Sequence, residues 1–208
     1  VLAIKDCIEK SHPKGKIGID LTTTSALFAS LLKGALEIPM AENVDVHEIV
    51  YKSRVIKDDY ELAEIGKAID ITEKAVVELA QNSKPGVNMR ELISQAHARA
   101  IREGAVHSFP NFLGKKREGM IKYGDLLSLD IGCRVPSGYF SDMGRVIPIT
   151  GSLTPNVRDF LEKKMEVHKR VIKFFKDGAS AEDILAETNR LHKELGWEPV
   201  VSFGHHLG

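Results

Sequence analysis

Apolar side chains that recur every three or four residues predict two long helices in the middle of the chain. The first helix begins near Asp58 and ends before Pro85-Gly86, because proline lacks the amide hydrogen that a helix interior needs. Asn88, with Glu91 three residues later, predicts the N-cap of a second helix that runs to Gly104. The apolar positions of the first helix are Leu62, Ile65, Ile69, Ala75, Val76 and Leu79.

The second half of the chain predicts strands as well as helices. Residues 126–132 form a short apolar run typical of a buried strand, and residues 139–149 are expected to return beside it as a hairpin. Further helices are expected from Thr154-Pro155 and from Ser180. Residues 199–203 are expected to form a strand that ends at Gly204-His205. The predicted fold class is therefore mixed α/β, of the α+β type.

The first fifty residues differ from the rest in the length of their predicted elements. Residues 16–20 and 44–46 are candidates for short strands, with a helix over residues 26–36 between them. After Ser53 the pattern changes to long helical periodicity. We therefore predict two domains, at residues 1–50 and 51–208.

Composition narrows the class of protein. Lys plus Arg and Asp plus Glu each number 29, so the formal net charge is zero and neither nucleic acid nor an anionic membrane is the expected partner. No apolar run reaches the roughly 18 residues of a membrane helix. The two cysteines suit a reducing compartment, and we expect a cytoplasmic protein. The chain starts at Val1 and stops at Gly208 within a Gly/His stretch, so we expect it to be a fragment.

Two aspartates are the candidates for chemistry. Asp130 lies in an apolar strand, where an ionised carboxylate is costly unless another charge compensates it, and Asp142 lies in the returning strand. With an imidazole, the two carboxylates would make a site of oxygen and nitrogen ligands suited to Mn, Co, Fe or Zn. The alternative is that backbone amides satisfy Asp130 while Asp142 faces water. The spacing alone does not decide between them.

Four segments in order resemble the motifs of the pita-bread metallopeptidases, which include methionine aminopeptidase, aminopeptidase P, prolidase and creatinase. They are residues 124–132, residues 141–145, Gly151 and residues 204–208. The resemblance extends over roughly residues 53–208, and several motifs in the right order are far more specific than one. It implies a pita-bread fold with two divalent metal ions.

The resemblance also implies a role for each matching residue. Asp130 would bind one metal, Asp142 would bridge both, and His205 would bind the other. His206 is a candidate for the wall of the substrate pocket, with an ordinary packed or solvated histidine as the alternative. The catalytic glutamate is expected beyond Gly208, so we expect these 208 residues alone to be inactive.

The segment before Ser53 resembles the end of the smaller N-terminal domain of prolidase, aminopeptidase P and creatinase, which favours the proline-specific branch. This implies a peptide substrate with proline in the second position, cleaved before proline by a metal-bridging water. Relatives often dimerise, so a homodimer is a candidate assembly. A catalytically inactive binding or scaffold module and a creatinase-like amidinohydrolase are the alternatives.

Three departures from the family pattern bear on these alternatives. The interval from Asp130 to Asp142 is one residue longer, which the Pro136-Ser137-Gly138 turn would absorb. The segment of residues 108–124 is several residues shorter than in relatives. The substrate-facing histidine of active relatives has no match here, because its expected position falls near Leu113 or Gly114. The remaining histidines are expected at the surface. They are His12, His47, His97, His168 and His192.

Overall fold

A computed structural model describes residues 2–11, 18–36, 45–114, 118–205 and 207. The chain divides into two compact units, Val1–Asp58 and Asp59–Gly208. The predicted domains, residues 1–50 and 51–208, stay a prediction, because a division into compact units does not by itself define domains. No helix in the described ranges is both long and apolar enough to cross a membrane.

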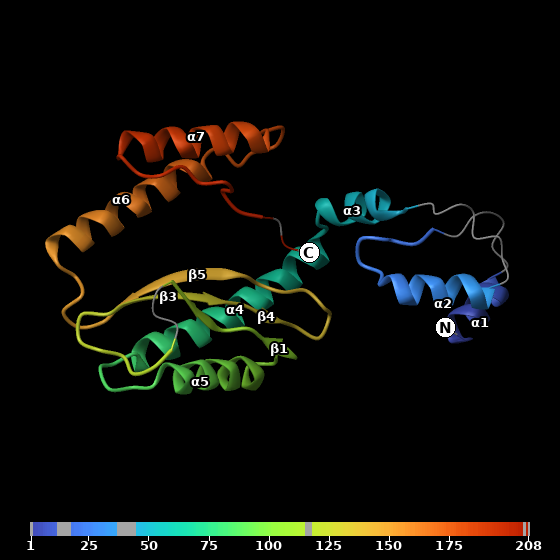
Figure 1. The fold of residues 1–208 in the computed structure, drawn as a ribbon, viewed down its shortest axis with the longest axis horizontal. Coiled ribbons are helices and arrows are strands. Elements are labelled where there is room, and N and C mark those ends of the chain that lie inside the picture. The colour runs from blue at the N-terminus through green and yellow to red at the C-terminus, as the bar shows by residue number, and fades with distance from the viewer. Residues whose placement is uncertain (1, 12–17, 37–44, 115–117, 206, 208) are drawn as a thin grey trace. The chain divides into compact units, whose positions relative to one another are not determined.

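The first unit is mainly helical, with α1 (Leu2–Ser11), α2 (Ala26–Leu36) and α3 (His47–Val55) shown in blue to cyan in Figure 1. Helix α2 confirms the helix predicted over residues 26–36. In place of the two short strands, the described residues contain one isolated parallel bridge between Ile19 and Asp45. Lys16 and Ile17 of the first predicted strand, and Val44 of the second, lie outside the described residues.

Asp20, next to Ile19 of the bridge, contacts residues on both bridged segments. Its Oδ1 accepts hydrogen bonds from the backbone N and the Oγ1 of Thr22, at 2.9 and 2.6 Å, and His47 Nδ1 lies 3.3 Å away. The Thr22 hydroxyl is the largest cause that lowers the pKa of Asp20 from its ordinary value of 3.8 to about 2. A carboxylate whose pKa is lower in the folded than in the unfolded state stabilises the fold at pH values above the unfolded-state pKa. This contribution is lost as the pH falls through the folded-state pKa.

We therefore expect wild type to melt at a higher temperature than Asp20→Asn at pH 6. The difference should shrink as the pH falls from 3.8 through about 2. Thermal melts followed by circular dichroism over this range measure it. Asp6→Asn is the control, since Asp6 pairs with Lys10 on the exposed face of α1 in the same unit. A difference between wild type and Asp20→Asn that does not depend on pH would contradict the assignment.

The second unit begins with the two predicted long helices, α4 (Asp59–Asn82) and α5 (Met89–Arg102), which are confirmed. Asn88 caps α5 as expected, because its side chain accepts a hydrogen bond from Arg90 N at 2.9 Å. Gly86 lies between the helices with a φ of 90°, a backbone conformation that glycine adopts without steric cost. The Pro85-Gly86 break therefore turns the chain so that α5 packs beside α4.

A three-stranded antiparallel sheet in the order β2-β3-β5 lies against these helices (Figure 1). Its strands are β2 (Asn111–Leu113), β3 (Leu126–Ile131) and β5 (Met143–Pro148), and a separate pair is formed by β1 (His107–Ser108) and β4 (Cys133–Arg134). The predicted pairing of residues 126–132 with the returning segment is confirmed. The returning strand begins later than predicted, because residues 139–141 bond back to residues 133–135 and the ladder to β3 begins only at Met143.

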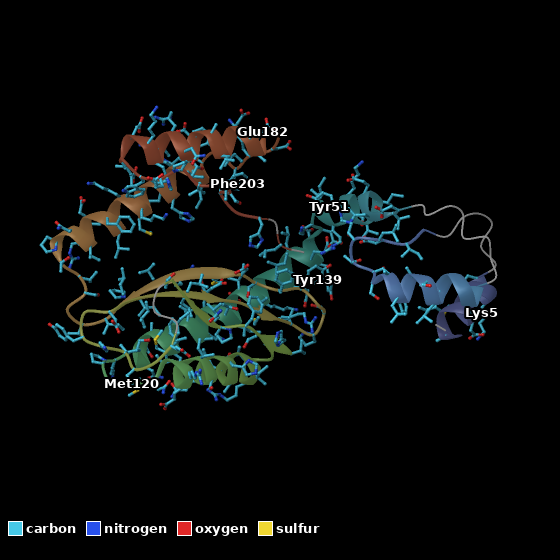
Figure 2. The ribbon with its side chains drawn as sticks, in the orientation of Figure 1. Lys5, Tyr51, Met120, Tyr139, Glu182 and Phe203 are labelled. Carbon is cyan, nitrogen blue, oxygen red and sulfur yellow. The ribbon has the colours of Figure 1, made fainter. Side chains whose placement is uncertain are left out.

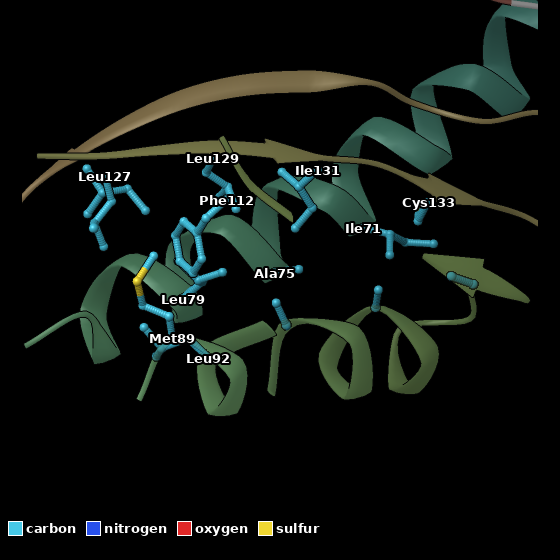
Figure 3. Packing of buried hydrophobic residues seen from close by; sticks show 14 of the residues in the cluster. Ile71, Ala75, Leu79, Met89, Leu92, Phe112, Leu127, Leu129, Ile131 and Cys133 are labelled. Atoms are coloured by element: carbon cyan, nitrogen blue, oxygen red, sulfur yellow. The ribbon is translucent and has the colours of Figure 1, made fainter. Parts of the chain in front are cut away.

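The core of this unit lies between the sheet and the helices (Figure 3). Alternate residues of β3 point into it, as expected for a strand with one covered face. Phe112 of β2 is fully buried beside them. The largest buried members of the cluster are Phe112, Leu79, Met89, Leu92, Ile121, Leu127, Leu129 and Ile131.

Two further helices, α6 (Pro155–Ile172) and α7 (Ala181–Glu194), confirm the predicted starts at Thr154-Pro155 and Ser180. They enclose a smaller cluster of Val167, Val171, Ile184 and Leu191.

The strand predicted over residues 199–203 is wrong. Val200 N donates to Asn189 Oδ1 at 2.8 Å, and Val200 O accepts from Asn189 Nδ2 at 3.1 Å. A side chain of α7 thus satisfies the backbone groups that a neighbouring strand would use. Phe203, labelled in Figure 2, packs its ring against Phe175 at 5.4 Å between centroids.

Candidate functional site

Asp130 lies on the face of β3 that points away from the helices. Leu129 and Ile131 on either side of it are buried in the core, so alternation along the strand directs Asp130 to the opposite face. It is half-buried, and its partners across the sheet are Asn111 of β2 and Gly144 of β5. Asp130 therefore lies in an apolar strand, as expected, but on the opposite face from the apolar residues that β3 directs into the core.

Asp142 comes directly before β5 and lies beside Asp130. Burial is the main cause that raises the pKa of Asp130, and the negative charge of Asp142 and a hydrogen bond between the two carboxyl groups raise it further. The charge of His205 acts in the opposite direction and lowers the same pKa. Two carboxylates this close repel each other, and a cation between them would remove the repulsion.

His205 completes the group from the far end of the chain. Its Nε2 lies 3.2 Å from Asp142 Oδ2, with 66% of the His205 side chain and 29% of the Asp142 side chain exposed. The three residues predicted from the motifs thus lie in one place, although their roles stay a prediction. They are linked in pairs through Asp142 and do not surround one point: in the described part of the chain, no three or more His, Cys, Asp or Glu side chains are grouped so that they could hold a metal ion. His206 lies outside the described residues.

Asn111 is a site neighbour that the sequence prediction missed. No strand is predicted within residues 108–124, whereas Asn111–Leu113 form β2, with Phe112 in the core and its two neighbours on the Asp130 face. The sequence carries no clear signal for this strand, because it has only three residues and its two apolar residues, Phe112 and Leu113, are adjacent rather than alternating with polar ones. Leu113, where the family's substrate-facing histidine was expected, lies opposite Ser128 and is 40% exposed.

His192 corrects one of the surface expectations. It is only 5% exposed on α7, its Nδ1 lies 2.9 Å from Glu198 O, and its ring meets the Trp197 ring edge to face. His47 and His97 also have specific partners, since each lies 2.7 Å from a hydroxyl oxygen, that of Thr22 and that of Ser108. His168 is exposed as expected, and His12 lies outside the described residues.

Comparison with known proteins shows the family of this chain. Residues 63–208 match the model of metallopeptidase family M24. The chain is 27% identical to the Xaa-Pro aminopeptidase of Escherichia coli over 195 residues, which cover 86% of this chain and 44% of that protein. It is 26% identical to the Xaa-Pro dipeptidase of Pyrococcus furiosus over 202 residues, or 85% of this chain and 57% of that one.

Two solved structures share the fold. The X-Pro aminopeptidase of Thermotoga maritima superposes with a TM-score of 0.83 at 21% identity, over 99% of this chain and 61% of that chain. The Xaa-Pro dipeptidase of Bacillus anthracis superposes with a TM-score of 0.83 at 24% identity, over 99% and 60%. The chain spans about half the length of the curated relatives described above. It belongs to metallopeptidase family M24 and has the pita-bread fold of the prolidases and aminopeptidases P.

Proposed function

We propose that the full-length protein containing this chain is a metal-dependent peptidase that hydrolyses the bond before proline, as an Xaa-Pro aminopeptidase or dipeptidase. The observation that carries the proposal is the close pair of carboxylates, Asp130 and Asp142, with His205 3.2 Å from the second. The named relatives supply the substrate class, since they are Xaa-Pro aminopeptidases and an Xaa-Pro dipeptidase. A peptide with proline in the second position is therefore the proposed substrate.

The donor set suits two hard or borderline divalent cations, of which Mn, Co, Fe and Zn are candidates. In this proposal Asp130 would hold one ion, Asp142 would hold both and His205 would hold the other. When bound, such ions lower the pKa of water and so supply a nucleophile at neutral pH. The aspartates would offset the charge of the ions, and His205 would have to be neutral to donate its nitrogen lone pair.

The substrate would lie over the sheet face that carries Asp130. Asn111, directly opposite Asp130, offers an amide that can both donate and accept hydrogen bonds. His206 is proposed as a further pocket residue on the basis of the motif alone. Hydrolysis also requires a group that transfers the proton of the attacking water, and we assign this role to none of these 208 residues. A cytoplasmic location is proposed from cysteine usage, in which both Cys7 and Cys133 are free thiols.

One observation favours an inactive scaffold module as the second candidate. Leu113 is an exposed apolar residue near the expected position of a substrate-facing histidine. An apolar side chain cannot donate a hydrogen bond to a peptide carbonyl. A scaffold would retain the fold without requiring metal.

The experiment is a hydrolysis assay of the full-length protein after removal of metal with a chelator. We expect no cleavage of Ala-Pro dipeptide or Ala-Pro-Ala until Mn²⁺ or Co²⁺ is restored, and little cleavage of the matched peptides with alanine in place of proline. The 208 residues alone should show no activity. Unchanged hydrolysis after thorough chelation would contradict the metal mechanism, and no hydrolysis with any of the four metals would favour the scaffold.

A further inference from the structure

A buried set of hydrogen bonds joins helix α4 to the residue before Asp142. Thr72 Oγ1 lies 2.7 Å from Ser141 Oγ, and the two residues are 1% and 0% exposed. Ser141 Oγ also accepts a hydrogen bond from Cys133 N at 3.2 Å. The Cys133 thiol, itself fully buried, donates to Ala68 O at 3.3 Å. The set therefore links two turns of α4 to the backbone of the segment that leads into β5.

One arrangement of hydrogens satisfies the whole set. Thr72 donates to Ser141, Ser141 donates to the Cys133 sulfur at 3.9 Å, and the Cys133 thiol donates to Ala68 O. A buried hydroxyl group that loses its hydrogen-bond partner destabilises the fold by about 1–3 kcal/mol. The set therefore favours the backbone position of Ser141 in which all of these hydrogen bonds form. Ser141 is thereby held toward α4.

The position of Ser141 determines where Asp142 points. Successive side chains of an extended segment point to opposite faces, so a Ser141 side chain directed at α4 sends the next side chain to the face that carries Asp130. The ladder between β3 and β5 starts at Met143 and does not include Asp142. Asp142 is therefore held from one side by Met143, the first residue of the ladder, and from the other by Ser141, whose backbone N also donates to Cys133 O at 3.0 Å.

We propose that Thr72 and Ser141 are positioning residues that hold the Asp142 carboxylate beside Asp130, ready to share a divalent cation. The expected effect on metal affinity rests on the proposed function. In it, hydrogen bonds from α4, on the core side of the sheet, support the metal ligands on the opposite face. Both hydroxyls are buried and bonded to each other, so neither is expected to touch a bound metal or substrate. Loss of a group hydrogen-bonded directly to a metal ligand typically lowers metal affinity about 10- to 100-fold, and Thr72 acts one residue further away, so the lower end of this range is expected.

The test compares three variants of the full-length protein. Thr72→Val removes the hydroxyl at nearly constant volume, and Thr72→Ser keeps the hydroxyl while losing the methyl group. Thr188→Val is the matched control, since Thr188 is also buried on a helix, is 6% exposed, and donates to Ile184 O within the separate α6–α7 cluster. Mn²⁺ affinity is measured by calorimetry well below each melting temperature, and the position of Asp142 by crystal structures of the metal-free proteins.

We expect Thr72→Val to bind Mn²⁺ at least about tenfold more weakly and to show Asp142 displaced or in several conformers. Thr72→Ser and Thr188→Val should stay within about twofold of wild type, whatever stability they lose. Unchanged affinity and an unmoved Asp142 in Thr72→Val would overturn the inference. So would an equal loss in Thr72→Ser or Thr188→Val, because packing or global stability would then be the cause. A wild type that binds no Mn²⁺ would refute the proposed function, while the crystal structures would still decide the positioning.

Discussion

Replacing Asp142 with asparagine is expected to lower hydrolysis of Xaa-Pro peptides by the full-length protein at least about a hundredfold. An amide oxygen carries no negative charge, and the amide nitrogen cannot bind a cation, so one side chain could no longer serve two ions. Loss of supporting contacts alone costs about 10- to 100-fold, and loss of a shared ligand should cost at least as much. The measurement is kcat/KM for an Xaa-Pro substrate at saturating Mn²⁺, together with Mn²⁺ affinity.

The fold should survive this change. The asparagine is nearly the same size, and Asp142 lies outside the buried cluster. The variant removes the repulsion between Asp130 and Asp142, and its amide oxygen can still accept a hydrogen bond from His205, so the metal-free protein should keep its circular dichroism spectrum. Asp159→Asn is the control, since Asp159 is an exposed residue of α6 whose carboxylate pairs with Lys163. Full activity in Asp142→Asn would contradict the role of Asp142 as a metal ligand.

Gly132→Ala is expected to be the most destabilising single substitution near the site. A Cβ atom at Gly132 would lie 2.0 Å from the backbone oxygen of Ser141 and 2.3 Å from the Phe109 ring. The Ser141 backbone cannot retreat easily, because its N donates to Cys133 O and its hydroxyl is bonded to Thr72. Overpacking of this kind costs about 1–3 kcal/mol, and occasionally more. Relief of the clash would also displace Asp142, so metal affinity should fall with stability.

Urea unfolding of the variants measures the effect. Gly66→Ala is the matched control, since Gly66 lies inside α4 and a Cβ atom added there would meet no other described part of the chain within 4 Å. Alanine favours a helix interior over glycine by about 1 kcal/mol, so this control should be slightly more stable than wild type. If Gly132→Ala unfolds at the same urea concentration as wild type, the close approach of Ser141 to Gly132 is not a constraint of the fold.

Local rules predicted much of the fold. The two long helices and their break at Pro85-Gly86 follow from apolar spacing and from the backbone limits of proline and glycine, all of which act within a few residues. The buried strand β3 follows from its run of apolar residues. Short strands were predicted less well, because β2 has three residues and gains its stability from pairing with β3 rather than from its own sequence.

The tail shows why local pattern fails where a distant partner competes. Residues 199–203 have the composition of a strand, yet both backbone groups of Val200 are bonded to Asn189 of α7. His192 likewise has charged neighbours in sequence but is buried against Trp197. In both cases the deciding contact comes from packing between α7 and the segment that follows it.

The sequence by itself determined which chemical groups are available at the site: two aspartates and a glycine-flanked histidine, in the order of a known set of motifs. Only the tertiary structure decided that Asn111 lies opposite Asp130 across the sheet and that Asp142 and His205 come together beside it. The physical reason is the distance along the chain between the residues responsible. Thr72 and Ser141 are 69 positions apart, and no local pattern records a hydrogen bond that forms only when α4 packs beneath the sheet.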